Sequence, residues 1–568
     1  MKSSKYLIAV SILLLGASCQ KQFLQLPISN TTNVDSVFST TVNAETAIAQ
    51  AYFDCLSQGL PYQGNWNSLI DDNMSGAMTF GLPWCWAEPF ATSTGMNASA
   101  GGEDMDGWTY NYTAIRAAYL VKENIDLVKD MDASDKAVVK AEMQALVAYR
   151  YEQMFIMYGG VPVLTGSLTP TDNLDIPRAT LETTLDSITS WCDQAAAVLP
   201  SVWPATWTGR MTKSAALAIK AKALIYAARP LFNSATPYLS LGSNNNLICF
   251  GAEDPTRWTT AAQACEAVIS EAQNNASISI INTGNPLADY GTATSTPGNP
   301  EVILAFKAEG FYSNSTTMFT FYNPHNWQAY ESMLTSQQLT NYYKSDGTNQ
   351  TWPNTTTILP FSDYLTRMNQ MEARFKADFW IWQSNAWNNP NDSYWDSTHV
   401  YQWVWDGAAV TVKFWYEAGT RSWFEFPIFR LAAFYLEAAE AYNEAGEPAQ
   451  ALAKLNVIHQ RAGLPAITVT GQTQLRAIIQ RESAVELFDE NYWLHDEKHW
   501  KLANIGNGLI GGPIREFTFN NGAGINYNNN QNYQDKVEYQ GFWAPSQYLN
   551  PFPQTEINKG YLVQNPGY

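Results

Sequence analysis

The sequence predicts a mainly α-helical protein with a tetratricopeptide-like helical scaffold, long loop-rich insertions and a few short strands. Three observations support this prediction. Apolar side chains recur at helical spacing over long stretches, for example at Met143, Val147 and Met154. Small residues recur within several of these helical stretches, where they would allow close packing of one helix against another. A long region rich in Asn, Thr, Gly, Trp and Tyr separates two helical parts, which is typical of functional loops carried by a scaffold.

Helical periodicity defines the expected helices in chain order. The helix that ends near Tyr158 is stopped by Gly159-Gly160, followed by Pro162. An Ala-rich helix allows close packing and ends at Pro230. The predicted helical segments are about 44–58, 108–130, 134–159, 179–199, 212–232, 256–273, 427–445, 447–462 and 472–501.

The clearest helix pair joins 427–445 to 447–462. Ala439, Ala441 and Ala451 are small enough to let the paired helices nest, and Gly446 makes the turn between them. Stacked pairs of this kind form a curved solenoid, so the pattern predicts a helical scaffold over about 44–275 and 427–501.

Residues 276–426 differ in composition from this scaffold. Asn, Thr, Gly, Trp and Tyr dominate there, and the strand-like runs are Glu301–Phe306, Phe379–Trp382 and Val410–Phe414. We therefore expect a loop-rich region that carries function. The last stretch, 502–568, is rich in Gly and Asn and is predicted to pack as ordered coil.

The N-terminus has the layout of an export signal. Lys2 and Lys5 precede an apolar run from Tyr6 to Leu15, which is too short to span a bilayer, and small residues then lead into Cys19. A cysteine directly after the cleavage point indicates a lipoprotein signal over 1–18, with lipidation at Cys19 as the membrane anchor. A plain secretory signal with an incidental cysteine is the alternative.

The composition argues against nucleic acid as a partner and is compatible with sugar binding. The formal charge is −19, so the surface repels phosphates. The chain contains 21 Trp, 30 Tyr and 25 Phe, and indole rings beside amides and carboxylates suit the apolar faces and hydroxyls of sugars. The cysteines other than Cys19 show no CxxC spacing, so buried thiols are expected, with one disulfide at most.

Short motifs occur in a characteristic order along the chain. They are Phe23-Leu24 after Cys19, Ala148-Tyr149-Arg150-Tyr151, Tyr158-Gly159-Gly160-Val161-Pro162, Gly209-Arg210 with Lys213 and Ala215, Ala227-Ala228-Arg229-Pro230-Leu231-Phe232-Asn233, Arg430-Leu431-Ala432, Glu437-Ala438-Ala439-Glu440-Ala441, Asn456, Arg461-Ala462-Gly463-Leu464-Pro465, Arg481-Glu482, Glu486-Leu487, Pro551–Ile557 and Gln564–Tyr568. In this order they resemble the SusD/RagB family, the outer-membrane lipoproteins of Bacteroidetes that capture nutrients for a TonB-dependent transporter. The resemblance covers nearly the whole length.

The resemblance implies a single SusD-like domain over 19–568. It implies a glycan-binding protein that delivers an oligosaccharide or polysaccharide to a SusC-like TonB-dependent transporter. The protein would be lipid-anchored in the outer membrane on the extracellular side. Gln20-Lys21-Gln22 lacks the acidic residues that often follow the cysteine of surface-displayed members, so the outward orientation comes from the family alone.

Two aromatic segments are the candidates for ligand contact. Trp84 and Trp86 interrupt a polar loop where no core periodicity requires them, and an extended backbone would place both indoles on one face. The second segment runs from Phe311 to Tyr330, and in the family ligand contacts come mainly from these two regions. The candidate residues are Asp71, Asp72, Trp84, Trp86, Tyr312, Tyr322, His325, Asn326 and Trp327. Loop packing is the alternative for each of them.

Other tryptophans are assigned to the core or to no role. Trp380 with Trp382, and Trp403 with Trp405, alternate along strand-like runs, and core packing is favoured for both pairs.

No catalytic residue, cofactor or metal site is predicted. His495 and His499 have the spacing of a zinc motif, but Asp496 occupies the position where that motif needs Glu. Two other classes stay open: an exported α-helical glycoside hydrolase, which needs only a pair of carboxylates, and a SusD-like binder of peptide or another non-glycan nutrient.

Overall fold

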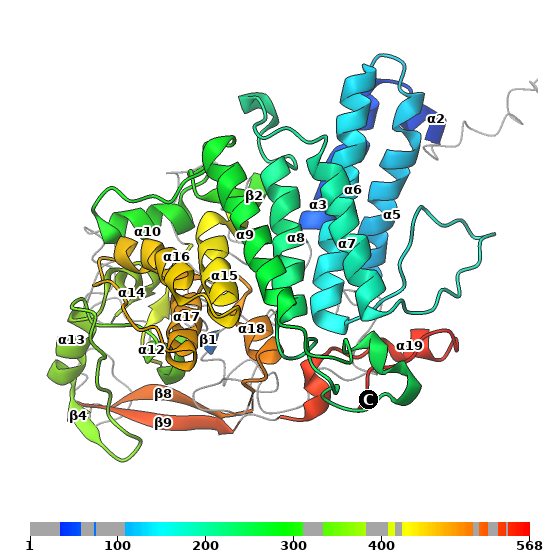
Figure 1. Ribbon diagram of the computed structural model, residues 1–568. Helices are drawn as coiled ribbons and strands as arrows, with labels where there is room; N and C mark the ends of the chain where they lie inside the picture. The colour runs from blue at the N-terminus through cyan, green and yellow to red at the C-terminus, as the bar shows by residue number, and fades with distance from the viewer. Residues whose placement is uncertain are drawn as a thin grey trace, which may run out of the picture.

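The computed structural model describes residues 34–57, 73–74, 108–309, 333–381, 407–414, 423–503, 511–520, 532–540 and 543–568. Long helices lie side by side in the first half of the chain and continue into a second group further along it (Figure 1). The first group is α2 (Val34–Val37), α3 (Thr41–Leu56), α5 (Trp108–Asn124), α6 (Ala133–Tyr158), α7 (Leu181–Ala196), α8 (Lys213–Ala228) and α9 (Thr256–Asn274). The second group is α15 (Leu431–Glu444), α16 (Pro448–Arg461) and α17 (Gln472–Glu486).

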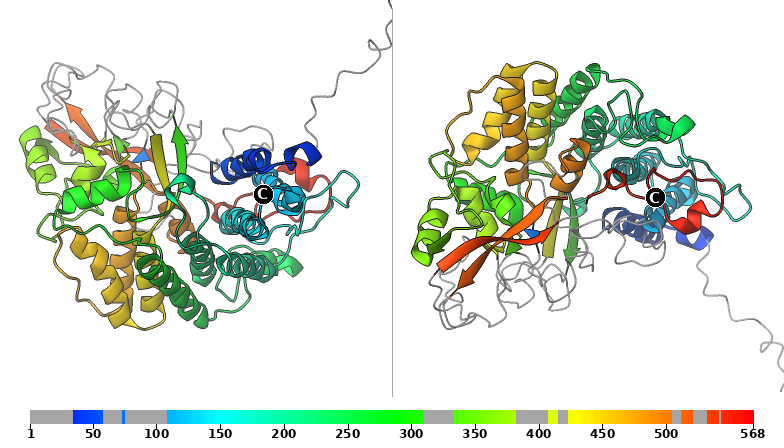
Figure 2. Two further views of the ribbon diagram at one scale, coloured as in Figure 1. Left: turned by 90° about the horizontal axis from the view of Figure 1, so that it is seen from above. Right: turned by 90° about the horizontal axis from the view of Figure 1, so that it is seen from below.

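These helices pack in a chain of neighbours. Helix α5 packs against α3 and α6, α6 against α7, α7 against α8, and α8 against α9. Helix α9 then contacts α15, which packs against α16 and α17, so the two groups form one curved layer when seen end-on (Figure 2). The predicted fold class, a mainly α protein with a tetratricopeptide-like scaffold, is confirmed.

Small residues explain the close packing of α8. Ala215, Ala218 and Ala221 are completely buried. The Thr212 side chain accepts a hydrogen bond from the Ala215 N–H and so begins the helix. Arg229 is already in extended backbone, as expected for a residue before proline.

Two glycines end α6 and allow the chain to pass close to the backbone of two other segments. Gly159 has φ of 82°, a conformation that glycine adopts without strain. Gly160 donates its N–H to the carbonyl oxygen of Leu247 at 2.8 Å. A Cβ on Gly160 would lie 2.2 Å from the carbonyl oxygen of Ala179, so only glycine fits against the backbone of this neighbouring segment.

Three small sheets lie beside the helical layer. One pairs β2 (Val302–Glu309) with β7 (Trp423–Arg430), and its last residue, Arg430, leads directly into α15. The second has the order β1 (Asn73–Met74), β3 (Met333–Leu334), β6 (Val410–Thr411) and β5 (Phe379–Trp380). The third has the order β4 (Ile358–Pro360), β9 (Asn532–Gln540) and β8 (Pro513–Asn520).

Two segments differ from the predicted secondary structure. The predicted helix over 472–501 is wrong as a single element, because α17 ends at Glu486 and a separate α18 covers Trp493–His499. The break carries Asp489 and Asn491 at φ of 60° and 65°, a conformation incompatible with a continuing helix. The C-terminal stretch is also not only coil, since it contains β8, β9 and the short α19 (Gln554–Ile557).

The region expected to be loop-rich contains helices among its described residues. They are α10 (Pro286–Ser295), α12 (Ser336–Leu339), α13 (Phe361–Asn369) and α14 (Ala373–Asp378). The three strand-like runs predicted there do contain strands, namely β2, β5 and β6.

The cysteines that the structure describes are buried free thiols, at Cys55, Cys192, Cys249 and Cys265. The prediction of buried thiols is confirmed for these four, and Cys85 lies outside the described residues. Within the described ranges, no helix has both the length and the hydropathy that crossing a bilayer requires.

Candidate functional site

Every residue predicted to bind the ligand lies outside the described residues, and so does Cys19. The ligand residues concerned are Asp71, Asp72, Trp84, Trp86, Tyr312, Tyr322, His325, Asn326 and Trp327. The described strands next to them nevertheless show where the two candidate segments join the described part of the chain.

The two candidate segments start from one strand pair. Strand β1 pairs antiparallel with β3, with Asn73 opposite Leu334 and Met74 opposite Met333. Paired Cα atoms in such a ladder are about 4.5–5.5 Å apart. The segment that leads to Trp84 therefore begins beside the end of the segment that carries Trp327, although the two are far apart in the sequence.

The last strand of the same sheet, β5, is buried. Strand β3 pairs with β6 and β6 with β5, where Trp380 lies opposite Val410. The Trp380 side chain is 1% exposed, so its predicted place in the core is confirmed. Trp382, Trp403 and Trp405 lie outside the described residues.

A buried carboxyl group supports this sheet from α14. Asp378 Oδ2 accepts hydrogen bonds from the hydroxyls of Tyr342 at 2.8 Å and Tyr290 at 3.1 Å, and the Asp378 carbonyl accepts from the Val412 N–H at 2.7 Å. Burial raises the pKa of Asp378 to about 7, against the opposing influence of Lys413 and the two tyrosines.

We expect this group to make stability depend on pH. The folded protein binds more protons than the unfolded chain between the ordinary pKa of an aspartate and the raised pKa of about 7, so stability falls as pH rises through that window. The loss should approach about 1.4 kcal/mol per pH unit. Asp378→Asn should remove this pH dependence because asparagine does not titrate, and its amide oxygen can still accept both tyrosine hydrogen bonds. Urea unfolding at about pH 5 and pH 8 measures this. Asp193→Asn, at an exposed ion pair, is the control, and equal pH slopes for wild type and Asp378→Asn would contradict the prediction.

A buried network of ion pairs lies next to this sheet and joins it to the scaffold. Arg430, at the end of β7, pairs with Glu301 at 3.1 Å, Glu486 at 3.2 Å and Glu490 at 2.7 Å. Arg461 of α16 contacts Glu301 at 2.9 Å and also pairs with Glu486. These side chains are at most 1% exposed.

The network extends to Lys413, two residues after the end of β6, and to α14. Lys413 pairs with Glu490 at 2.7 Å, and Arg374 pairs with Glu482 at 2.6 Å. Burial alone would raise the pKa of Glu486, but the guanidinium groups of Arg461, Arg430 and Arg374 outweigh it and hold that pKa below its ordinary value. Several motif residues that carry the family resemblance are therefore fixed by mutual charge compensation in the core.

In the segment with zinc-motif spacing, Asp496 and His499 contact other parts of the protein core. Asp496 pairs with Arg229, and His499 Nε2 lies 3.0 Å from the carbonyl oxygen of Ile156. Burial lowers the pKa of His499 to about 3. Among the described residues, no group of histidine, cysteine and carboxylate side chains has the arrangement of a metal site.

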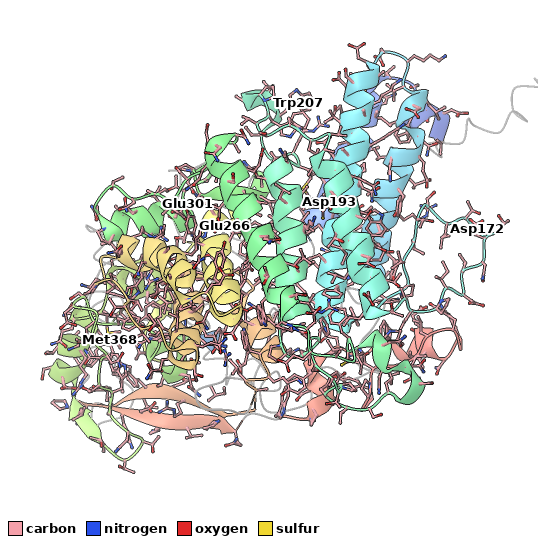
Figure 3. The ribbon with its side chains drawn as sticks, viewed as in Figure 1. Asp172, Asp193, Trp207, Glu266, Glu301 and Met368 are labelled. Carbon is pink, nitrogen blue, oxygen red and sulfur yellow. The ribbon has the colours of Figure 1, made fainter. Side chains whose placement is uncertain are left out.

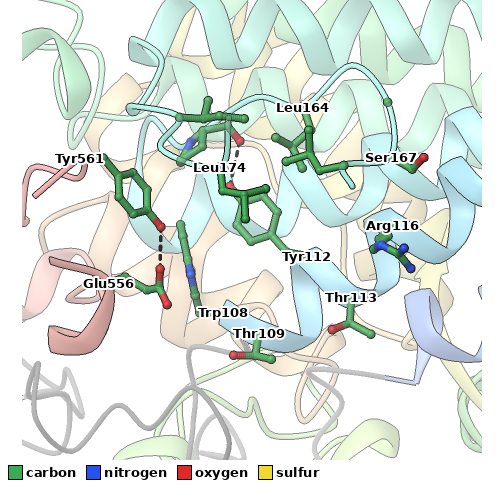
Figure 4. A pocket seen from close by; sticks show the side chains of 14 residues that line it. Trp108, Thr109, Tyr112, Thr113, Arg116, Leu164, Ser167, Leu174, Glu556 and Tyr561 are labelled. Carbon is green, nitrogen blue, oxygen red and sulfur yellow. Dashed lines mark hydrogen bonds between the residues drawn. The ribbon is translucent and has the colours of Figure 1, made fainter. Parts of the chain in front are cut away.

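The described residues also enclose a cavity of about 370 Å³ beside the N-terminal half of α5 (Figure 4). Trp108, Tyr112 and Arg116 line it from the helix, and Glu556 and Tyr561 line it from the C-terminal part of the chain. The remaining wall comes from the 162–176 connection. The sequence prediction missed this set, although the spacing of four between Trp108, Tyr112 and Arg116 places them on one helix face.

Two family models match the chain, one in its C-terminal half and one in its N-terminal part. A model described as SusD family matches residues 300–568, and a model described as starch-binding associating with outer membrane matches residues 31–225. No curated protein matches the chain.

Solved structures share its fold over nearly the whole length. A SusD-like protein from Bacteroides fragilis NCTC 9343 is 21% identical, with a TM-score of 0.74 over 96% of this chain and 100% of that chain. A SusD-like carbohydrate binding protein from the same organism is 17% identical, with a TM-score of 0.66 over 93% of this chain and 99% of that chain. A laminarin binding SusD-like protein is 18% identical, with a TM-score of 0.54 over 94% of this chain and 100% of that chain. With SusD models matching both its N-terminal and its C-terminal parts, the chain belongs to the SusD/RagB family.

Proposed function

We propose that the protein is a cell-surface glycan-binding lipoprotein, which captures an oligosaccharide or polysaccharide and delivers it to a TonB-dependent outer-membrane transporter. The family match supports carbohydrate binding and association with the outer membrane. The names of two matched structures, a carbohydrate binding protein and a laminarin binding protein, support the same class of ligand.

The observation that carries the proposal is the β1–β3 pair. It joins the described ends of the two aromatic segments, so Trp84 and Trp86 can share one ligand with Trp327. Asp71 and Asp72 directly precede β1 and are the proposed partners of sugar hydroxyls. Tyr312, Tyr322, His325 and Asn326 complete the proposed surface.

A glycan array with the chain lacking residues 1–19 tests the function. We expect binding to at least one class of oligosaccharide or polysaccharide, with no reducing sugar released from the bound glycan. Release of reducing sugar would support the glycoside hydrolase alternative. Binding to peptides with no glycan retained would support a different nutrient.

Lipidation at Cys19 is the proposed membrane anchor, because an export-signal layout leads directly into this cysteine. Cys19→Ser should leave a protein that is either unprocessed or released from membranes, which fractionation and mass determination of the N-terminus measure. Cys55→Ser, at a buried thiol, is the matched control and should stay in the membrane fraction. Normal membrane recovery of a correctly cleaved Cys19→Ser protein would contradict the anchor.

The transporter partner is the remaining part of the proposal. A lipid-anchored binder needs a partner to move its ligand across the membrane, and the anchor keeps the two proteins at high effective concentration. The tetratricopeptide-like helices offer the contact face in this proposal, since stacked repeats present extended binding surfaces.

A further inference from the structure

The cavity beside α5 has an aromatic end and a charged end. Trp108, Tyr112 and Arg116 follow one another at intervals of four residues, so they lie along one face of the helix. At about 1.5 Å per residue, the Trp108 and Arg116 backbones are about 12 Å apart along the axis. Figure 4 shows Trp108 and Tyr561 toward one end of the cavity and Arg116 at the other.

The aromatic end is held in place by its surroundings. The Trp108 ring packs edge-on against Phe552 at 5.1 Å and Tyr158 at 5.6 Å between ring centroids. Tyr112 donates its hydroxyl to the Pro162 carbonyl at 2.8 Å, and Tyr561 donates to Glu556 Oε2 at 2.6 Å. The rings are therefore preorganised, which lowers the entropy cost of placing a ligand against them.

At the other end, Arg116 is an exposed cation. Within the described parts of the chain, its exposed guanidinium forms neither a hydrogen bond nor an ion pair. Two carboxylates beside the cavity wall already have partners, Glu556 at the aromatic end and Glu123 next to Ser167. Glu556 pairs with Lys559 at 2.8 Å, and Glu123 accepts hydrogen bonds from the N–H of Ser167 at 2.8 Å and from its hydroxyl.

We propose that this cavity is a second carbohydrate site, which binds an acidic saccharide of about disaccharide length. The apolar face of one sugar ring packs against the partly exposed rings of Tyr112 and Tyr561, since Trp108 itself is only 6% exposed. The carboxylate of a uronate unit binds the Arg116 guanidinium, which matches a carboxylate in two parallel hydrogen bonds. A volume of about 370 Å³ lies at the lower end of the range for small-ligand sites.

This inference takes the ligand class from the proposed function and adds a second site with a preference for negative charge. None of the residues that line the cavity belongs to the two aromatic segments proposed to hold the main glycan. The two sites can therefore be separated by substitution.

Calorimetry with a uronate-containing disaccharide and its neutral counterpart tests the proposal. The wild-type protein should prefer the acidic disaccharide, and Arg116→Gln should weaken its binding by at least about tenfold, as expected for one hydrogen-bonded charge. The neutral disaccharide should bind equally to both proteins. Arg116 is exposed and has no partner among the described residues, so its replacement should leave folding intact. Lys129→Gln, which removes the same charge from an exposed site elsewhere, should bind like wild type.

A further variant separates this site from the main one. The double change Trp84→Ala with Trp86→Ala should leave binding of the acidic disaccharide unchanged. Equal affinity of wild type and Arg116→Gln for the acidic disaccharide would overturn the second site, even if glycan arrays are positive. An array on which no glycan binds would instead overturn the proposed function.

Discussion

Replacing Arg430 with alanine should lower the free energy of unfolding by about 3–5 kcal/mol. The guanidinium is 1% exposed and compensates the carboxylates of Glu301, Glu486 and Glu490. Its removal leaves negative charges close together in a region from which water is excluded. Because the cost of an unpaired buried charge exceeds the gain from a typical contact, this substitution should be among the most damaging in the chain.

Urea unfolding followed by circular dichroism measures this effect. Lys140→Ala is the matched control, because Lys140 also forms an ion pair, with Asp126 at 2.6 Å, but both side chains are exposed. It should cost no more than about 1 kcal/mol. Equal losses in the two variants would show that the buried network contributes no more than a surface pair.

Replacing Trp84 and Trp86 together with alanine should weaken glycan binding by roughly a hundredfold without unfolding the protein. Each indole ring that a sugar covers contributes about 1.5 kcal/mol or more of apolar burial, and two such losses correspond to about 3 kcal/mol. The single change Trp327→Ala should weaken binding in the same direction by a smaller factor.

Calorimetry with a glycan identified on the array measures both effects. Trp207→Ala is the matched control, since Trp207 is 42% exposed and lies near the top of the view in Figure 3, whereas β1 lies in the lower half of the same view in Figure 1. It should bind glycan as wild type does. If affinity were unchanged in the Trp84/Trp86 and Trp327 variants, the site would have to lie elsewhere, with the segment of Trp387 and Trp395 as the next candidate.

The helical scaffold was predictable because its signals are local. The Gly159-Gly160 stop, the alanines of α8 and the Gly446 turn each act within a few residues, and Gly446 has the positive φ, 79°, that the turn requires. The break after Glu486 was missed because it uses Asp489 and Asn491 in left-handed conformation instead of glycine or proline. Strand β8 was missed because a register shift between Ile514 and Arg515 disrupts the alternation that marks a strand.

The site was less predictable because it depends on contacts between distant residues. Sequence reasoning selected the aromatic segments from their composition, but nothing local indicated that Met74 and Met333 would pair. The partners of Arg430 lie just before β2 (Glu301), at the end of α17 (Glu486) and in the turn that follows it (Glu490). Arg116 became a candidate only because the C-terminal residues Glu556 and Tyr561 complete the wall of the cavity that it lines.

The pairing of Asn73 with Leu334 also sets the order of events during biogenesis. A chain that is translocated N-terminus first delivers Trp84 and Trp86 long before β3 emerges to complete the sheet. Closing so long a loop is entropically costly and kinetically slow. For a chain exported as proposed, the two aromatic segments can therefore come together only after β3 has emerged from the translocation channel.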